Sequence, residues 1–493
     1  MKNIFKNRRF KYGSLATVIT VGFIVALILI NVVATLILER YPLAIDLTSD
    51  SRFKLTSESV DYIKNINEDV TITILADEAA FESAHGESDI MVSDLYKQAY
   101  EIIKDYTRNS SRIKVEFVNL LKNPGFEKEY PNETLNDDDI IVSTSKRYRK
   151  FGISELFTFA SSQYGGTTYS SQAEQVMTSA VMYVTDDNPA TVTLLTGVDN
   201  IDTSDLESLL ESNNFQIVSK NLLTEEIDQD SAMVLLPQPK ADLTADQVKK
   251  LETYLDNDSQ FGKSLIFIAS ATDEIGPVLK NFLADWGMEI GDGLVTETNT
   301  SNIYQQYGIP MPAMMNVSVA DNEIASAMRN PNLALVSDNA RPVNALFESK
   351  DNRIVKILAQ SPTTTVLNPL NSEGFDATTA EQQSYNVAVM GTKTRLINNE
   401  SHISSVAVFG SAGMASSSLL QQGSFSNGDF MVSVVNSITE KKDNVKIIPI
   451  DMSMKSINIT ENQVKIYFAI FVCVIPALVI VAGIVVWLRR RHL

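Results

Sequence analysis

The chain has 493 residues, a formal net charge of −19, 44% hydrophobic residues and a single cysteine. This length suffices for two or three domains. The acidic excess argues against a nucleic-acid partner, which needs a basic surface, and one cysteine excludes an internal disulfide or a cysteine-based metal site.

Two uncharged apolar runs lie near the ends of the chain, at residues 14–38 and 466–488. Each is longer than the roughly twenty residues with which a helix crosses a bilayer core. Basic residues flank both runs on the terminal side, which predicts cytoplasmic tails at 1–13 and 489–493. We therefore expect a two-pass cell-membrane protein in the lipid bilayer, with both termini cytoplasmic and the main body extracytoplasmic. A cleaved signal peptide is the alternative for the first run, which is longer than a typical h-region.

Residues 45–187 alternate between strand and helix patterns, which is typical of a small α/β domain. The strands show alternating apolar residues, and the helices show apolar residues three and four positions apart. In chain order, the patterns predict a helix at 57–63, a strand at 70–75, a helix at 89–106, a strand at 113–118, a hairpin at 139–151 and a helix at 172–184.

After Asn188-Pro189 the pattern changes to short, continuously apolar strands between helices. Such strands are typical of a parallel sheet covered on both faces. We therefore expect a second α/β domain at 188–450, with an irregular insertion at about 295–385. The expected strands are 190–195, 215–218, 232–237, 264–269, 387–391, 405–410 and 445–448, and the expected helices are 204–211, 245–255 and 429–439.

Small and polar residues follow several of these strands, where α/β proteins bind their ligands. The candidate ligand or contact loops contain Gly197, Asp199, Ser270, Asp273 and Ser411. None of these loops has the pattern of a P-loop or of a dinucleotide-binding turn. Tight turns that begin the next helices are therefore the simpler interpretation.

No complete catalytic or metal-binding set is present in the sequence. Residues 410–413 read Gly-Ser-Ala-Gly rather than the G-x-S-x-G of a hydrolase elbow, and the two histidines of the main body, His85 and His402, are far apart. Two histidines so far apart in the sequence make a weak case for zinc, which favours three or four ligands. The acidic runs at 137–139 and 256–258 lack the ligand spacing of a calcium loop. We expect a protein that is not an enzyme and that has no catalytic residue, cofactor or metal.

Two other function classes stay open. A cell-surface hydrolase acting on glycan or peptide could use Asp199 and Asp273, if their carboxylates lay about 5–9.5 Å apart. A signalling or adhesion ectodomain is disfavoured, because the predicted cytoplasmic tails are too short to hold a signalling domain.

Short motifs at both ends of the chain follow one another in a distinctive order. They are Asp46-Leu47-Thr48, Arg52-Phe53, Leu55-Thr56 and Val70-Thr71-Ile72 near the start, and Gly410-Ser411-Ala412-Gly413, Gly428-Asp429-Phe430, Asn436-Ser437-Ile438, Ile475-Pro476 and Trp487-Leu488-Arg489-Arg490-Arg491 near the end. This order resembles the GldG family, the auxiliary components of ABC transport systems that are named from gliding motility. The likeness covers nearly the whole chain.

The resemblance implies a thioredoxin-like first domain and a second domain similar to the glutamine-amidotransferase-like, flavodoxin-type parallel-sheet fold. It also implies two partners, a multi-pass ABC permease and a cytoplasmic ATPase, since this chain has no Walker motif. The catalytic cysteine of true amidotransferases is missing, because Cys473 falls in the second apolar run. We therefore expect a non-enzymatic, membrane-anchored accessory subunit whose extracytoplasmic part binds substrate or partner.

Three residues interrupt the uniform second run. Cys473, Pro476 and Gly483 are small or kink-forming, and such positions allow membrane helices to pack closely. They are the candidate helix-packing residues toward the permease.

Overall fold

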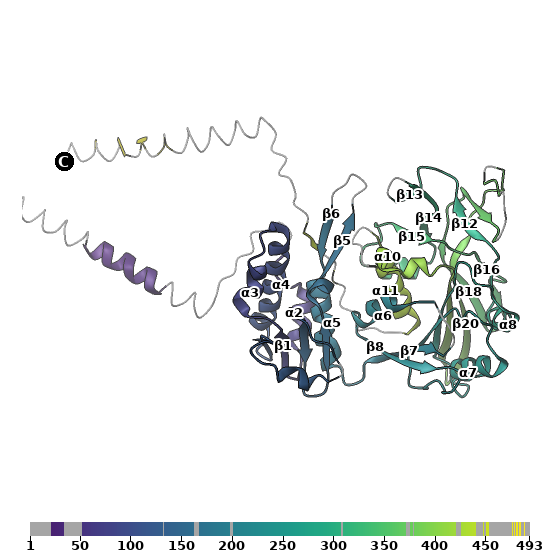
Figure 1. Ribbon diagram of the computed structural model, residues 1–493. Helices are drawn as coiled ribbons and strands as arrows, with labels where there is room; N and C mark the ends of the chain where they lie inside the picture. Colours follow the sequence, from purple (N-terminus) through teal and green to yellow (C-terminus); the bar gives the residue numbers. More distant parts are fainter. Residues whose placement is uncertain are drawn as a thin grey trace, which may run out of the picture. The chain divides into compact units, whose positions relative to one another are not determined.

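The chain divides into two compact units in the computed structural model (Figure 1). Unit 1 comprises residues 1–152, 177–187 and 445–450, and unit 2 comprises residues 153–176, 188–444 and 451–493. The structure describes residues 21–33, 52–131, 133–161, 167–197, 201–306, 309–370, 375–377, 379–420, 425–439, 447, 450–452, 476, 478, 480–481, 483–484 and 488.

The prediction of two membrane-spanning helices is wrong for the part of the chain that the structure describes. No helix there is both long enough and apolar enough to cross a bilayer. The described part of the first apolar run, residues 21–33, is helical. The two-pass location predicted from the basic flanks is not supported either.

Unit 1 contains a four-stranded sheet in the order β2-β1-β3-β4. Strand β1 pairs in parallel with β2 and antiparallel with β3, and β3 pairs antiparallel with β4. The strands are β1 (Val70–Ile74), β2 (Ile113–Phe117), β3 (Ile140–Ser143) and β4 (Tyr148–Phe151), and the helical segments are α2 (Ser57–Lys64), α3 (Glu78–Glu82), η2 (Ala84–Gly86), α4 (Ile90–Asn109) and η3 (Phe126–Glu129).

Helix α4 crosses between the two parallel strands and shows how the sequence specifies this unit. Asp89 caps its first turn by accepting a hydrogen bond from the Met91 N–H, and the side chains of Leu95, Ala99 and Ile102 are buried at helical spacing. Tyr106, on the same face, donates to or accepts from Thr178 of α5 (Ala173–Thr185) at 2.5 Å.

Unit 2 is built on an eleven-stranded sheet, nine strands of which follow the order β13-β14-β18-β20-β21-β10-β9-β7-β8. Strands β8, β7, β9, β10 and β21 pair in parallel, while β21, β20, β18 and β14 pair antiparallel. The strands of this sheet are β7 (Ala190–Thr196), β8 (Phe215–Asn221), β9 (Met233–Pro237), β10 (Ser264–Ile268), β13 (Ile303–Gln306), β14 (Ile309–Val319), β15 (Leu335–Asp338), β17 (Ser349–Lys350), β18 (Arg353–Gln360), β20 (Asn386–Ile397) and β21 (Glu400–Phe409).

Smaller pairs and the helices complete unit 2. Helices α7 and α8 contribute to the hydrophobic cluster on one face of the large sheet, and α6, α9 and α11 contribute to the cluster on the other (Figure 1). The helical segments are η4 (Ile153–Leu156), α6 (Ser204–Glu211), α7 (Ala245–Asp256), α8 (Pro277–Asp285), α9 (Asn322–Ala327), η5 (Gly413–Ala415), α10 (Ser417–Leu420) and α11 (Asn427–Ile438). The remaining strands are β5 (Phe157–Ser161), β6 (Thr167–Ser171), β11 (Met288–Ile290), β12 (Leu294–Glu297), β16 (Val343–Ala345) and β19 (Thr365–Asn368), and the two residues of β22 (Ile450–Asp451) are divided between the units.

The structure is mixed α/β with large sheets, and it differs from the prediction in the second half of unit 2. A sheet of parallel strands alone was expected, yet an antiparallel half continues from β21 through the hairpin that joins it to β20. Residues 295–385, expected to be an irregular insertion, contain β13, β14, β15 and β18. Their strands carry polar residues between apolar ones because parts of this half face solvent.

Candidate functional site

The carboxyl ends of the parallel strands bring three of the predicted loop residues to one edge of the sheet. Ser270 follows β10, and its N–H donates to Oε1 of Gln238, which follows β9, at 2.8 Å. The Nε2 of Gln238 donates to the backbone oxygen of Asp273 at 3.1 Å. Ser411 follows β21, the parallel neighbour of β10. Residues distant in sequence therefore meet at this edge.

The hydroxyl groups at this edge complete turns. Ser270 Oγ accepts from the N–H of Asp273 at 3.2 Å, and Ser411 Oγ donates to the backbone oxygen of Asp338 while accepting from the Met414 N–H at 3.1 Å. Both serines are buried, so their bonds stabilise the loops.

Gly197 and Asp199 belong to the loop after β7. Gly197 has a φ of +89°, and a Cβ there would lie 2.0 Å from the side-chain oxygen of Asn221, so this position requires glycine. Asp199 lies outside the described residues, so the carboxylate pair of the hydrolase hypothesis stays a prediction.

A buried arginine that the sequence analysis did not single out ties these loops together. The Arg341 side chain is fully buried. Its Nη1 donates to the backbone oxygen of Asp273 at 2.8 Å, its Nε to that of Gly291 at 3.0 Å, and its Nη2 to Oδ1 of Asp292 at 2.9 Å. A buried guanidinium with three acceptors holds the loops in one geometry.

Asp338 lies at the end of β15, next to the Ser411 loop. Its Oδ1 accepts from Asn339 Nδ2 at 2.8 Å. Burial raises the pKa of the Asp338 carboxyl above its ordinary value, because desolvation disfavours the charged form. A raised folded-state pKa contributes stability that is present below the ordinary aspartate pKa and is lost as pH rises through the raised value.

Replacing this carboxyl by an amide removes the desolvation penalty at neutral pH. Asp338→Asn should therefore raise the free energy of unfolding at pH 7, and the gain should shrink as pH falls to about 4, the ordinary aspartate range. Urea unfolding at several pH values measures both. If the gain in the free energy of unfolding stayed constant with pH, the raised pKa of the Asp338 carboxyl would be contradicted.

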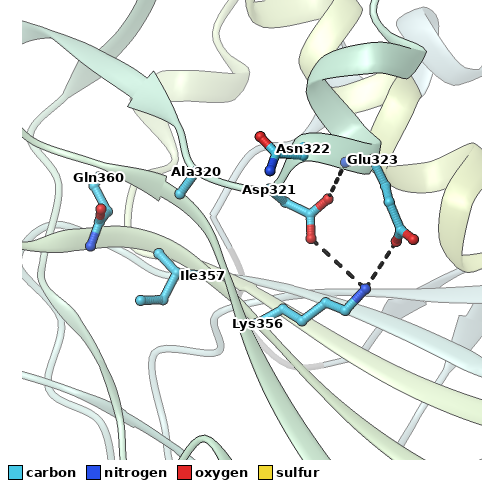
Figure 2. A pocket seen from close by; sticks show the side chains of 7 residues that line it. All are labelled: Ala320, Asp321, Asn322, Glu323, Lys356, Ile357 and Gln360. Atoms are coloured by element: carbon cyan, nitrogen blue, oxygen red, sulfur yellow. Dashed lines mark hydrogen bonds and ion pairs between the residues drawn. The ribbon is translucent and has the colours of Figure 1, made fainter.

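A shallow groove of about 510 Å³ opens beside α9 in unit 2. Figure 2 shows Lys356 of β18 reaching between two carboxylates, with Nζ 2.9 Å from Glu323 Oε2 and 3.9 Å from Asp321 Oδ2. Asp321 also caps α9, because its Oδ1 accepts from the N–H groups of Glu323 and Ile324. The groove is lined by Ala320, Asp321, Asn322, Glu323, Lys356, Ile357 and Gln360.

Unit 1 holds a separate cluster around Asp138, whose side chain is 11% exposed. His85 Nε2 lies 2.9 Å from Asp138 Oδ1, and the Tyr96 hydroxyl donates to Oδ2 at 2.8 Å. Burial and the Asp138 carboxylate raise the pKa of Tyr96 above its ordinary value. His85 and Asp138 both have positive φ, at 56° and 66°. His402 lies in β21 of unit 2.

The remaining predicted residues belong to the second apolar run. Pro476 and Gly483 lie at exposed helical positions, and no atom lies within 4 Å of a Cβ built on Gly483. Cys473 lies outside the described residues. Within the described part of the chain, no three His, Cys, Asp or Glu side chains are placed to hold a metal ion.

Comparisons with known proteins leave the family open. Residues 49–156 match a family model described as a domain of unknown function (DUF7088). No curated protein matches the chain significantly. Among solved structures, it is similar to a chain of the structure of PurLQS from Thermotoga maritima, with 11% identity over 51% of this chain and 99% of that chain and a TM-score of 0.25. So weak a likeness assigns neither fold nor function, and the thioredoxin-like and amidotransferase-like assignments stay predictions.

Proposed function

We propose that this chain is a non-enzymatic accessory subunit of an ABC transport system, and that unit 2 binds the substrate or a partner subunit through the groove beside α9. The observation that carries the proposal is the exposed ion pair in this groove. Glu323 and Lys356 have side chains that are 78% and 41% exposed, yet they lie at the wall of a groove and can be reached by another molecule.

The chemistry of the groove suits recognition of a polar chain. Lys356 offers ammonium protons, Glu323 and Asp321 offer carboxylate oxygens, and Gln360 and Asn322 add amides. Exposed ion pairs stabilise a protein by only about 0–1 kcal/mol, so a partner can exchange them for its own contacts at little cost. The resemblance to ABC auxiliary components supports a partner subunit as the occupant.

Charge reversal in the groove tests this proposal. Lys356→Glu should reduce the amount of ABC permease and ATPase that co-purifies with the chain in mild detergent by about tenfold, equivalent to about 1.4 kcal/mol. The co-purified ATPase is measured by quantitative immunoblotting or mass spectrometry.

Lys350→Glu is the matched control, because Lys350 is an exposed lysine of the same unit that does not line the groove. Its recovery of ATPase should equal that of the unmodified chain. Equal recovery with Lys356→Glu would refute the role of the groove, and absence of permease and ATPase from the unmodified chain would refute the proposed function.

A further inference from the structure

The antiparallel half of the large sheet has an exposed apolar face on strands β18, β20 and β21. Residues directly opposite each other in an antiparallel ladder point to the same face. Ile354 pairs with Thr392, and Thr394 pairs with Ile403, so these four residues share a face with Leu396, which follows two positions along β20. We call Ile354, Thr392, Thr394, Leu396 and Ile403 the hairpin face.

The apolar side chains of the hairpin face are open to solvent. Leu396 is 70% exposed, Ile354 46% and Ile403 38%. Further along the same face of β20, Met390 and Ala388 are buried in the cluster that includes residues of α9 and α11. The helical layer that covers this face therefore ends before the described strands do, and a further helix would continue it.

The opposite face of the same strands already has its partners. Lys393 lies 4.3 Å from the Trp286 ring centroid and pairs with Asp285, and Arg395 donates to the backbone oxygen of Ser259 at 2.8 Å. The two basic residues of β20 are thus directed away from the hairpin face, which leaves that face without their charge.

Acidic groups border the hairpin face. Asp321 and Glu323 lie at the groove end around Lys356, which pairs with Met390 on the same face of the sheet. Two carboxylates against one ammonium give this border a net negative charge, in a chain whose net charge is −19. An apolar surface with an acidic border is complementary to an apolar surface with basic flanks.

We propose that the hairpin face binds an amphipathic helix of a partner subunit, with leucine-like side chains on one side and basic residues flanking them. This inference rests on the proposed function and names the chemistry of the partner. The helix would pack its apolar side on Ile354, Leu396 and Ile403. It would place its basic residues toward Asp321 and Glu323, as an amphipathic helix does when it binds an apolar surface with an acidic border.

A synthetic peptide tests this proposal on the full chain. The probe is a fluorescein-labelled amphipathic peptide of leucine and lysine, about 18 residues or five turns long. Fluorescence anisotropy should show that it binds at least tenfold more tightly than the same peptide with glutamate in place of lysine. Leu396→Asn and Ile403→Asn should each weaken binding of the lysine peptide about tenfold, and hydrogen exchange should show protection at 392–396 and 401–405.

Leu223→Asn is the control, because Leu223 is a 56% exposed leucine of the same unit outside the hairpin face. Neither this control nor the test variants change the net charge of the chain. A loss of peptide binding that occurs only in the test variants therefore reports contact with the hairpin face, and not the general attraction of a cationic peptide to an acidic protein. Equal weakening by Leu223→Asn would overturn the proposal. So would self-association that Leu396→Asn abolishes in sedimentation, because the occupant would then be a second copy. All three variants replace exposed side chains and should keep the urea midpoint of the unmodified chain.

The two proposals fail in different ways. Undiminished co-purification of permease and ATPase with Leu396→Asn would overturn the hairpin-face inference and leave the accessory function standing. Peptide binding that requires Leu396, in a chain that recovers no permease or ATPase, would overturn the accessory function alone.

Discussion

Gly410→Ala should lower the free energy of unfolding of unit 2 by about 3 kcal/mol, the upper end of the usual penalty for overpacking. A Cβ at Gly410 would lie 2.1 Å from the backbone oxygen of Arg341. The backbone segments at Gly410 and Arg341 cannot move apart freely. The Arg341 N–H donates to the backbone oxygen of Gly410 at 2.7 Å, and the Gly410 N–H donates to the backbone oxygen of Val387 at 2.8 Å. Urea unfolding monitored by fluorescence of the buried Trp286 measures the effect.

Gly125→Ala provides the contrast for that measurement. Gly125 has a φ of −81°, and no atom lies within 4 Å of a Cβ built there. Since it belongs to unit 1, its replacement should leave the Trp286 transition within about 0.5 kcal/mol of the unmodified chain. An unchanged midpoint for Gly410→Ala would show that the close approach of the two backbones does not exist.

Arg341→Met should also destabilise unit 2 by about 3 kcal/mol. Methionine keeps much of the buried volume but removes all three hydrogen bonds, which leaves the backbone oxygens of Asp273 and Gly291 without this donor. Such acceptors lose solvation on folding and are costly when unpaired. The free energy of unfolding from urea titration gives the size of the effect.

Asp292→Asn separates the ion pair from the carbonyl bonds. Asp292 is 74% exposed, so its pairing with Arg341 is weakened by solvent, and its replacement should cost no more than about 1 kcal/mol. A larger loss with Asp292→Asn than with Arg341→Met would contradict the assignment of the main stabilisation to the two carbonyl contacts.

Periodicity and capping residues predicted helices and strands well where a segment buries one face, as α4 does, or all of its side chains, as β10 does. The expected helix at 89–106 corresponds to α4 (Ile90–Asn109), and the expected strand at 264–269 corresponds to β10 (Ser264–Ile268). In both, the apolar pattern reflects how the segment is buried. Strands β14 and β18 were missed because they alternate between core and solvent irregularly, with a register shift between Ile357 and Ala359 of β18.

The arrangement of the candidate sites could be predicted only in part. Ser270, Asp273 and Ser411 follow strands, so their placement at one sheet edge follows from parallel pairing. The role of Arg341 depends on loops at Asp273 and Gly291 that are 68 and 50 residues away. No local pattern marks such an arginine. The membrane prediction rested on two long apolar runs and their basic flanks, and it is wrong for the described part of the chain.

The position of β10 has a consequence for how this chain acquires its structure during synthesis. Its partner on one side, β9, precedes it closely, but its partner on the other side is β21, and the contact between Lys263 and Ser404 spans 141 residues. A ribosome must therefore release the whole antiparallel half before the middle of the sheet can close. Long-range pairing of this kind slows folding and exposes an apolar strand edge meanwhile. During that interval the unpaired edge of β10 is open to pairing with other nascent chains.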